Sequence, residues 1–147
     1  MSVLFTDVMT VYNYHRDLET EKETWTRSVV RGVQWSHNKS EVTTSGSVQT
    51  ENKVEKITVD FQKKYGNKPY LPPQEYAKLP DEEREGFWTL DAKLGKDIMV
   101  FGVSEQEISR EYRISRLSED FQYVATVTVV SDNRNKPRLK NIKVVGK

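Results

Sequence analysis

The sequence contains no cysteine. A disulfide framework, a thiolate metal site and a thiol nucleophile are therefore excluded. Its seven glycines are scattered rather than clustered, and it has no phosphate-cradling glycine loop, no nucleophile elbow and no zinc-hydrolase helix motif. These absences argue against an enzyme, and we expect neither a cofactor nor a small-molecule substrate.

Net charge and long apolar runs are also lacking. The 23 lysines and arginines nearly cancel the 22 aspartates and glutamates, which leaves a net charge of +1. Generic binding to duplex DNA is therefore not indicated, and a charged partner would have to bind a local patch of charged residues. No stretch approaches the roughly 20 apolar residues of a membrane helix, and no basic region followed by an apolar run opens the chain. We expect a soluble protein, made in the cytosol, with no membrane partner.

The length of 147 residues predicts a single domain spanning residues 1–147. A chain of this size buries about two thirds of its unfolded surface, enough for one core. Only 35% of the residues are hydrophobic and 31% are charged. We therefore expect one modest core under a heavily charged surface.

The last quarter of the chain, residues 121–147, is typical of a long β-hairpin. From residue 121 to 130, β-branched and aromatic residues alternate with a period of two, and a second apolar run at 142–145 follows a turn rich in Asp, Asn and Pro. Both strands carry apolar residues on either face. This pattern favours strands inside a sheet or barrel wall over solvated edge strands.

Further strands are predicted upstream, so the fold class is mostly β. We expect strands at 8–14, at 24–35 with Gly32 as a bulge or close-approach point, and at 54–65. Residues 87–103 suggest a second hairpin, with its turn at 91–96 and its second strand at 97–103. This hairpin should pack beside the terminal one.

Two segments break the strand pattern. Residues 36–53 are polar, with too few apolar side chains to offset the entropy of ordering, and we interpret them as a long flexible loop. Residues 66–86 form a Pro-rich insertion, which excludes a central strand and leaves short helical turns at 74–79 and 81–85. One more helical turn is expected near Ser115.

The candidate catalytic and metal-binding residues are better explained as surface residues. His15 and His37 have no second ligand at metal spacing. The acids at 81–85 suit the first turn of a helix, where they favour the helix dipole. Glu105 and Glu107 share a strand face but have no partner that would separate their pKa values. We therefore predict no catalytic, cofactor or metal site.

The loop of the terminal hairpin is the strongest candidate for a contact site. Its closely spaced cations are Arg134, Lys136, Arg138 and Lys140. A run of cations is usually a solvated loop, but two well-formed strands would hold these in one place, where they could contact DNA phosphates or an acidic protein surface. Trp25, Trp35 and Trp88, with Arg27 and Arg31 interleaved, are also ingredients of a stacking platform for single-stranded nucleic acid, although core packing is the better interpretation.

Several stretches resemble one known family, the head-to-tail connector proteins of siphophages, also described as minor capsid or head-completion (stopper) proteins. The clearest are TVTVVSDNRN (126–135), the basic turn, and IKVVGK (142–147). TVYNY (10–14), VVRGVQWS (29–36) and GKDIMVFG (95–102) are similar to the family in the same order. The resemblance spans nearly the whole chain, but residues 66–86 are longer and richer in proline than the family core.

The resemblance implies a small β-barrel of the stopper type with a long loop between early strands, and a structural role in the virion. Such proteins form a ring, a dodecamer, in the neck between capsid and tail, where they close the portal channel, retain packaged DNA and offer the tail a docking surface. The implied partners are the portal or head-tail adaptor protein, the tail terminator protein, further copies of the chain and packaged DNA.

Two alternatives remain open. A tail-terminator or tail-tube-associated protein also builds rings from small β-rich subunits. An OB-like module that binds single-stranded nucleic acid through the tryptophans and the basic loop is the alternative from another class.

Overall fold

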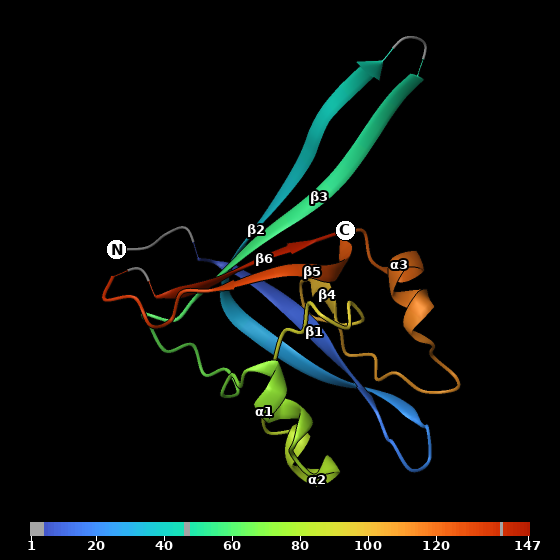
Figure 1. Ribbon diagram of the computed structural model, residues 1–147, viewed down its shortest axis with the longest axis vertical. Coiled ribbons are helices and arrows are strands. Elements are labelled where there is room, and N and C mark those ends of the chain that lie inside the picture. The colour runs from blue at the N-terminus through green and yellow to red at the C-terminus, as the bar shows by residue number, and fades with distance from the viewer. Residues whose placement is uncertain (1–4, 46–47, 139) are drawn as a thin grey trace.

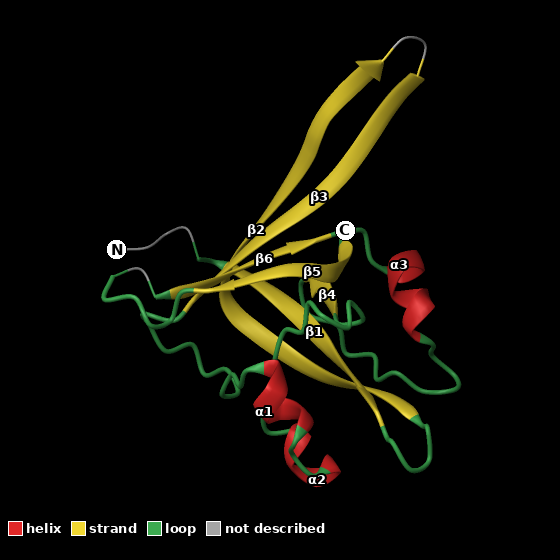
Figure 2. Ribbon diagram, in the orientation of Figure 1, coloured by secondary structure: helices red, strands yellow, loops and turns green. Residues whose placement is uncertain are grey.

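The computed structural model describes residues 5–45, 48–138 and 140–147; for residues 37–45 and 48–53 it describes the backbone only. Its body is an antiparallel sheet, shown in Figures 1 and 2. The strands are β1 (Asp7–Arg16), β2 (Glu23–Ser45), β3 (Val48–Asp60), β4 (Ile98–Phe101), β5 (Val124–Asp132) and β6 (Asn141–Gly146). The predicted mostly β fold class is confirmed.

The strands are hydrogen-bonded in the order β1-β2-β3-β6-β5-β4, and β4 pairs in turn with β1. Every strand of the sheet therefore has two neighbours. The terminal hairpin lies inside the sheet as predicted, because β6 also pairs with β3, and β5 also pairs with β4. Only one face of these strands is buried, through Ala125, Val127, Ile142 and Val144, whereas Thr128 and Lys143 are exposed.

The helical elements are all short. They are α1 (Pro73–Ala77), α2 (Asp81–Arg84), the 3-10 helix η1 (Ile114–Arg116) and α3 (Leu117–Asp120). Proline stands directly before α2 and at the start of α1, where the missing N–H costs no helical hydrogen bond. The predicted helical turns in the Pro-rich insertion and near Ser115 are confirmed.

Two predictions about connections are wrong. Residues 36–45 and 48–53 are not a loop: β2 and β3 stay paired out to Ser45 and Val48, and they form the hairpin that projects from the sheet in Figure 1. Backbone pairing extends a register already fixed in the sheet at Val33 and Val59, and the segment needs no apolar burial for that. Residues 87–90 do not pair with β4 either; Trp88 forms an isolated bridge with Tyr70.

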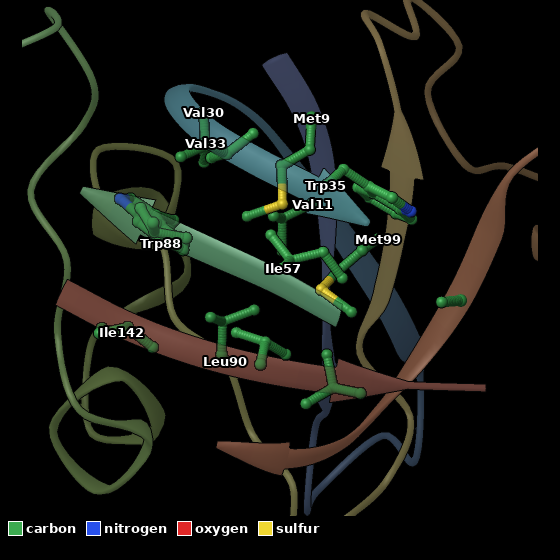
Figure 3. Close-up of a cluster of buried hydrophobic side chains, with 14 of the residues drawn as sticks. Met9, Val11, Val30, Val33, Trp35, Ile57, Trp88, Leu90, Met99 and Ile142 are labelled. Carbon is green, nitrogen blue, oxygen red and sulfur yellow. The ribbon is translucent and has the colours of Figure 1, made fainter. Parts of the chain in front are cut away.

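The core consists of two clusters of buried side chains. The larger one lies within the sheet, and Figure 3 shows Met9, Trp35, Ile57, Trp88 and Leu90 converging there. A smaller cluster joins Tyr12 and Val100 to Tyr112 and Leu117. The middle of β1 is buried on both faces because its successive side chains point alternately into these two clusters.

The strand register shifts at three places, one of them between Ser40 and Thr43 in the β2–β3 pair and the other two at bulges in β2 and β5. In β2, Asp7 pairs with Val33 and Val8 with Arg31, so Gly32 is the extra residue, at a φ of +78°. In β5, the register with β6 shifts between Val127 and Val129. Val127 is fully buried while Val129 is 53% exposed, so the predicted alternation ends at this bulge.

Candidate functional surfaces

The four predicted contact residues lie on the β5–β6 loop, but their environments differ. Lys136, Arg138 and Lys140 have exposed side chains. Arg134 is half-buried and holds Asp132 through two hydrogen bonds, from Nε to Oδ1 and from Nη2 to Oδ2, each of 2.9 Å. These hydrogen bonds lower the pKa of the Asp132 carboxyl. The structure therefore separates one anchored cation from three solvated ones.

Arg134 also joins the loop to aromatic residues. Its guanidinium lies 4.6 Å from the ring centre of Tyr70 and 5.8 Å from that of Phe61. A guanidinium at this distance is attracted by the negative face of the ring. Arg134 consequently fixes the start of the β5–β6 loop against residues 61–70.

A second basic loop, residues 61–68, lies beside the first. The Phe61 N–H donates to the Lys140 carbonyl at 2.9 Å, which places Lys63 and Lys64 next to the predicted cations. Residues 60–68 and 132–140 together carry seven lysines and arginines but only two acids, Asp60 and Asp132. We call the surface formed by these two loops the basic surface. Sequence reasoning missed its second loop, although the adjacent lysines at a strand end were a visible signal.

The second loop is held in place by side-chain contacts. Asn67 donates to the Arg31 carbonyl and accepts from the Arg31 N–H, both at 2.8 Å. The Tyr65 ring covers Gly32, and its hydroxyl donates to Asp60 at 2.5 Å. Burial, followed by the hydrogen bond to Asp60, raises the pKa of Tyr65 to about 12. The predicted close approach at Gly32 is confirmed, and Tyr65 is the residue that makes it.

The projecting part of the β2–β3 hairpin is the second distinctive feature. Pairing of β2 with β1 ends at Val33, and pairing of β3 with β6 ends at Glu55. Beyond these points each strand has the other as its only partner strand among the described residues. In Figure 1 this part extends well past the sheet, away from the two basic loops. We call residues 36–53 the arm.

Aromatic side chains surround the base of the arm. Trp35 packs edge-on against Phe101 with 5.6 Å between ring centres, and Phe101 packs against Tyr123 at 6.1 Å. The Trp35 indole donates to Glu55 at 3.0 Å. Phe101 nevertheless keeps 36% of its surface exposed.

The tryptophans do not form a common stacking platform. Trp88 and Trp35 are buried in the larger core cluster, with exposed fractions of 1% and 6%. Trp25 is half-buried and packs edge-on against Tyr14, at 5.2 Å between ring centres. The core interpretation is confirmed for Trp35 and Trp88.

The remaining candidate residues lie on the surface or in ion pairs. Glu82, Glu83, Glu85 and Glu105 are exposed. Asp81 pairs with Arg84, and Glu107 accepts from Arg27 Nε at 3.0 Å. Burial, more than the nearby Arg84, lowers the pKa of the half-buried His15, and the side chain of His37 lies outside the described part. Within the described residues, no group of three or more His, Cys, Asp and Glu is placed to hold a metal ion.

A wide groove of about 1360 Å³ runs between α2 and residues 107–114. Charges of both signs line it, including the Arg27–Glu107 and Arg84–Asp81 pairs. The buried Trp25 Nε1 and Arg84 Nε have no hydrogen-bond partner among the described residues. This mixture of charges selects no single class of ligand.

Asp97 is a buried carboxylate that the sequence did not reveal. Its Oδ1 accepts from the Tyr14 N–H at 2.8 Å, and its Oδ2 accepts from the Asp91 N–H at 2.8 Å and from Asn13 Nδ2 at 3.1 Å. Burial raises the pKa of Asp97 to about 7, although these hydrogen bonds oppose the shift. The carboxylate joins β1 to the turn that precedes β4.

No helix of the described residues has the length and apolar character needed to cross a membrane. Residues 4–147 match the model of a protein family described as a family of unknown function, DUF6751. The match covers nearly all of the chain, so the protein belongs to this family. No curated protein and no solved structure significantly matches the chain. Its role is therefore argued from the arrangement of its residues and from the sequence resemblance.

Proposed function

We propose that this member of the DUF6751 family is a structural virion protein of a tailed phage, a head-to-tail connector of the stopper type. Copies of the chain form a ring in the neck, beneath the portal or its adaptor. The ring closes the portal channel, retains the packaged DNA and gives the tail its docking surface. The resemblance of the terminal hairpin supports this role, and the return of pairing from β4 to β1 suits the small barrel of such proteins.

The arm is the observation that carries the proposal. A two-stranded hairpin is at best marginally stable in water on its own, and among the described residues the strands of the arm pair only with each other beyond Val33 and Glu55. Such an element gains stability when a neighbouring subunit covers it. An arm that leaves a well-packed sheet is therefore better suited to assembly than to binding a small molecule.

The two ends of the sheet offer different surfaces. β3 enters from the arm and ends at Asp60, which pairs with Asn141 beside the basic surface. The exposed Lys136, Arg138 and Lys140 are suited to an acidic neighbour or to DNA in the channel, because rim charges accelerate association and add salt sensitivity. One subunit can thus contact different partners at its two ends, as a connector between head and tail requires.

The alternatives differ in how much support they have. A tail-terminator or tail-tube-associated ring protein would use the same arm, so the position in the particle separates it from a connector. The OB-like alternative has lost its proposed platform, because two of its three tryptophans are in the core. It now relies on the basic surface alone.

Shortening the arm tests the assembly role. Removing residues 40–52 and joining Lys39 to Lys53 through an Asn-Gly turn keeps the facing Lys39–Lys53 pair and all pairings of the sheet. We expect the purified variant to melt as the unaltered chain does, while phage carrying it accumulate heads without tails that lose DNA. Normal yields of infectious particles would rule out the arm as an assembly element.

A further inference from the structure

A pocket opens beneath the two basic loops, apart from the wide groove at α2. Its volume is about 380 Å³, within the range of roughly 300–1,000 Å³ that is common for ligand sites. Asp60, Phe61 and residues 63–70 line it, together with Trp88 and Arg134. All of these residues are described, and they come from three separate parts of the chain.

Aromatic rings line the inner part of this pocket. Phe61 and Trp88 lie nearly parallel, with 6.3 Å between ring centres, and Tyr70 packs edge-on against Trp88 at 4.9 Å. The Trp88 indole Nε1 is buried and has no hydrogen-bond partner among the described residues. A buried N–H without an acceptor is unfavourable. A ligand that brings an oxygen acceptor to this indole would remove that cost.

Apart from Asp60, the charged residues that line the pocket are cationic. Lys63 and Lys64 are exposed, and Arg134 reaches the pocket from the β5–β6 loop. Asp60 is the one carboxylate in the lining, and its oxygens already accept from the Tyr65 hydroxyl and the Gln62 N–H. Lys68 turns away, because its ammonium donates to the Arg27 carbonyl and the Ser28 hydroxyl. The charge favours an anionic ligand.

We propose that this pocket binds a nucleotide unit. The phosphate lies against Lys63, Lys64 and Arg134, and the base packs on Phe61, the aromatic ring next to Trp88 that is only partly buried, with a carbonyl oxygen directed toward the Trp88 indole. Aromatic rings combined with cations are the usual components of sites for single nucleotides and for unpaired strands. An acidic peptide would satisfy the cations, but its carboxylates would gain little from the rings. The inference does not depend on the connector role, since it concerns the isolated chain.

Calorimetric titration of the full-length chain with dTMP, thymidine and inorganic phosphate tests the two halves of the site separately. We expect dTMP to bind about tenfold more tightly than either fragment, since base stacking and phosphate contacts each contribute. In ¹H–¹⁵N spectra, dTMP should shift the Trp88 indole resonance, and phosphate alone should not. Equal affinity for dTMP and phosphate, or no binding of dTMP at millimolar concentration, would overturn the proposal.

A pair of charge variants locates the site. Lys63→Gln with Lys64→Gln should weaken dTMP binding at least several-fold, because two of the three cationic contacts to the phosphate are lost. Lys78→Gln with Lys93→Gln removes the same charge from exposed positions outside the pocket and should leave binding unchanged. If both double variants bind dTMP equally well, the pocket is not the site.

Two further probes identify the source of the nucleotide. If a short oligothymidylate binds more tightly than dTMP and is displaced by dTMP, the natural ligand is a single strand of DNA. If the oligomer binds more weakly, the natural ligand is a free nucleotide. Both results agree with a nucleotide site in this pocket. A polyglutamate peptide that binds as tightly as dTMP and shows the same loss in the Lys63, Lys64 variant would contradict it. These titrations need no particle, so their failure would leave the connector role untouched.

Discussion

The Arg134 guanidinium lies over the Tyr70 ring at 4.6 Å while it holds Asp132 through two hydrogen bonds of 2.9 Å. This contact ties the β5–β6 loop to the Pro-rich insertion. We expect Arg134→Lys to lower the free energy of unfolding by about 1 kcal/mol, because a lysine keeps the charge but loses the planar pairing and stacking. Urea denaturation monitored by tryptophan fluorescence measures this change.

The other three cations of the loop provide the control. Lys136→Gln, Arg138→Gln and Lys140→Gln together should change the free energy of unfolding by less than about 0.5 kcal/mol, because their side chains are solvated. In phage, the triple variant should impair docking or DNA retention. Normal assembly of the triple variant would show that these residues are only a solvated turn.

The bulge in β5 predicts opposite outcomes at two nearby valines. Val127→Asp should unfold the protein, because an unpaired carboxylate at a fully buried position costs several kcal/mol. Val129→Asp should be tolerated, since Val129 is 53% exposed. Circular dichroism at 25 °C distinguishes the two. A folded Val127→Asp protein would contradict the register of β5.

Gly32 and Gly66 form a matched pair, since both have a φ of +78°. A Cβ at Gly32 would lie 2.4 Å from the Tyr65 ring, whereas nothing lies within 4 Å of one at Gly66. Gly66→Ala should therefore cost about 1 kcal/mol of backbone strain, and Gly32→Ala clearly more. Thermal melts measure the destabilisation caused by each substitution. In a Tyr65→Ala background, part of the extra destabilisation caused by Gly32→Ala should disappear. Equal costs for both glycines in the unaltered background would count against the Tyr65 contact.

Asp97 should make stability depend on pH. Because its folded pKa of about 7 is above its ordinary value of 3.8, the folded state holds the proton more tightly. This contribution to stability is complete below pH 4 and is lost as pH rises to about 7, at no more than about 1.4 kcal/mol per pH unit. Urea titrations at several pH values measure the slope.

Asp97→Asn is the corresponding variant. It should flatten the slope between pH 4 and 7 and lower stability, since an amide nitrogen in place of Oδ2 would face the donors of Asn13 and Asp91. An unchanged slope in this variant would mean that another group titrates.

The sequence predicted the strands well because their signal is local. Residues 121–130 alternate with a period of two, residues 8–14 and 24–35 are rich in β-branched and aromatic residues, and each segment lies in a strand or overlaps one in the structure. The strands of the arm were not predicted, because the residues in this part of the sequence are mostly polar. Its order comes from backbone pairing that begins inside the sheet at Val33 and Val59, and composition does not report on such pairing.

The candidate surfaces were predicted only in part, because they depend on contacts between distant residues. The basic loop was visible as a run of cations. Its neighbour at 61–68 became part of the same surface only through the contact between Phe61 and Lys140, 79 positions apart in sequence. Asp97 likewise gave no local signal, since its partners Asn13 and Tyr14 belong to the first strand.

The connector role is tested most directly by cryo-electron microscopy of the neck in intact phage particles that encode this chain. We predict a ring of copies between the portal or its adaptor and the tail, with each arm packed on a neighbouring subunit and the basic surface turned toward DNA or an acidic partner. Particles whose neck lacks the chain, or in which it lies at the tail tip, would contradict the account.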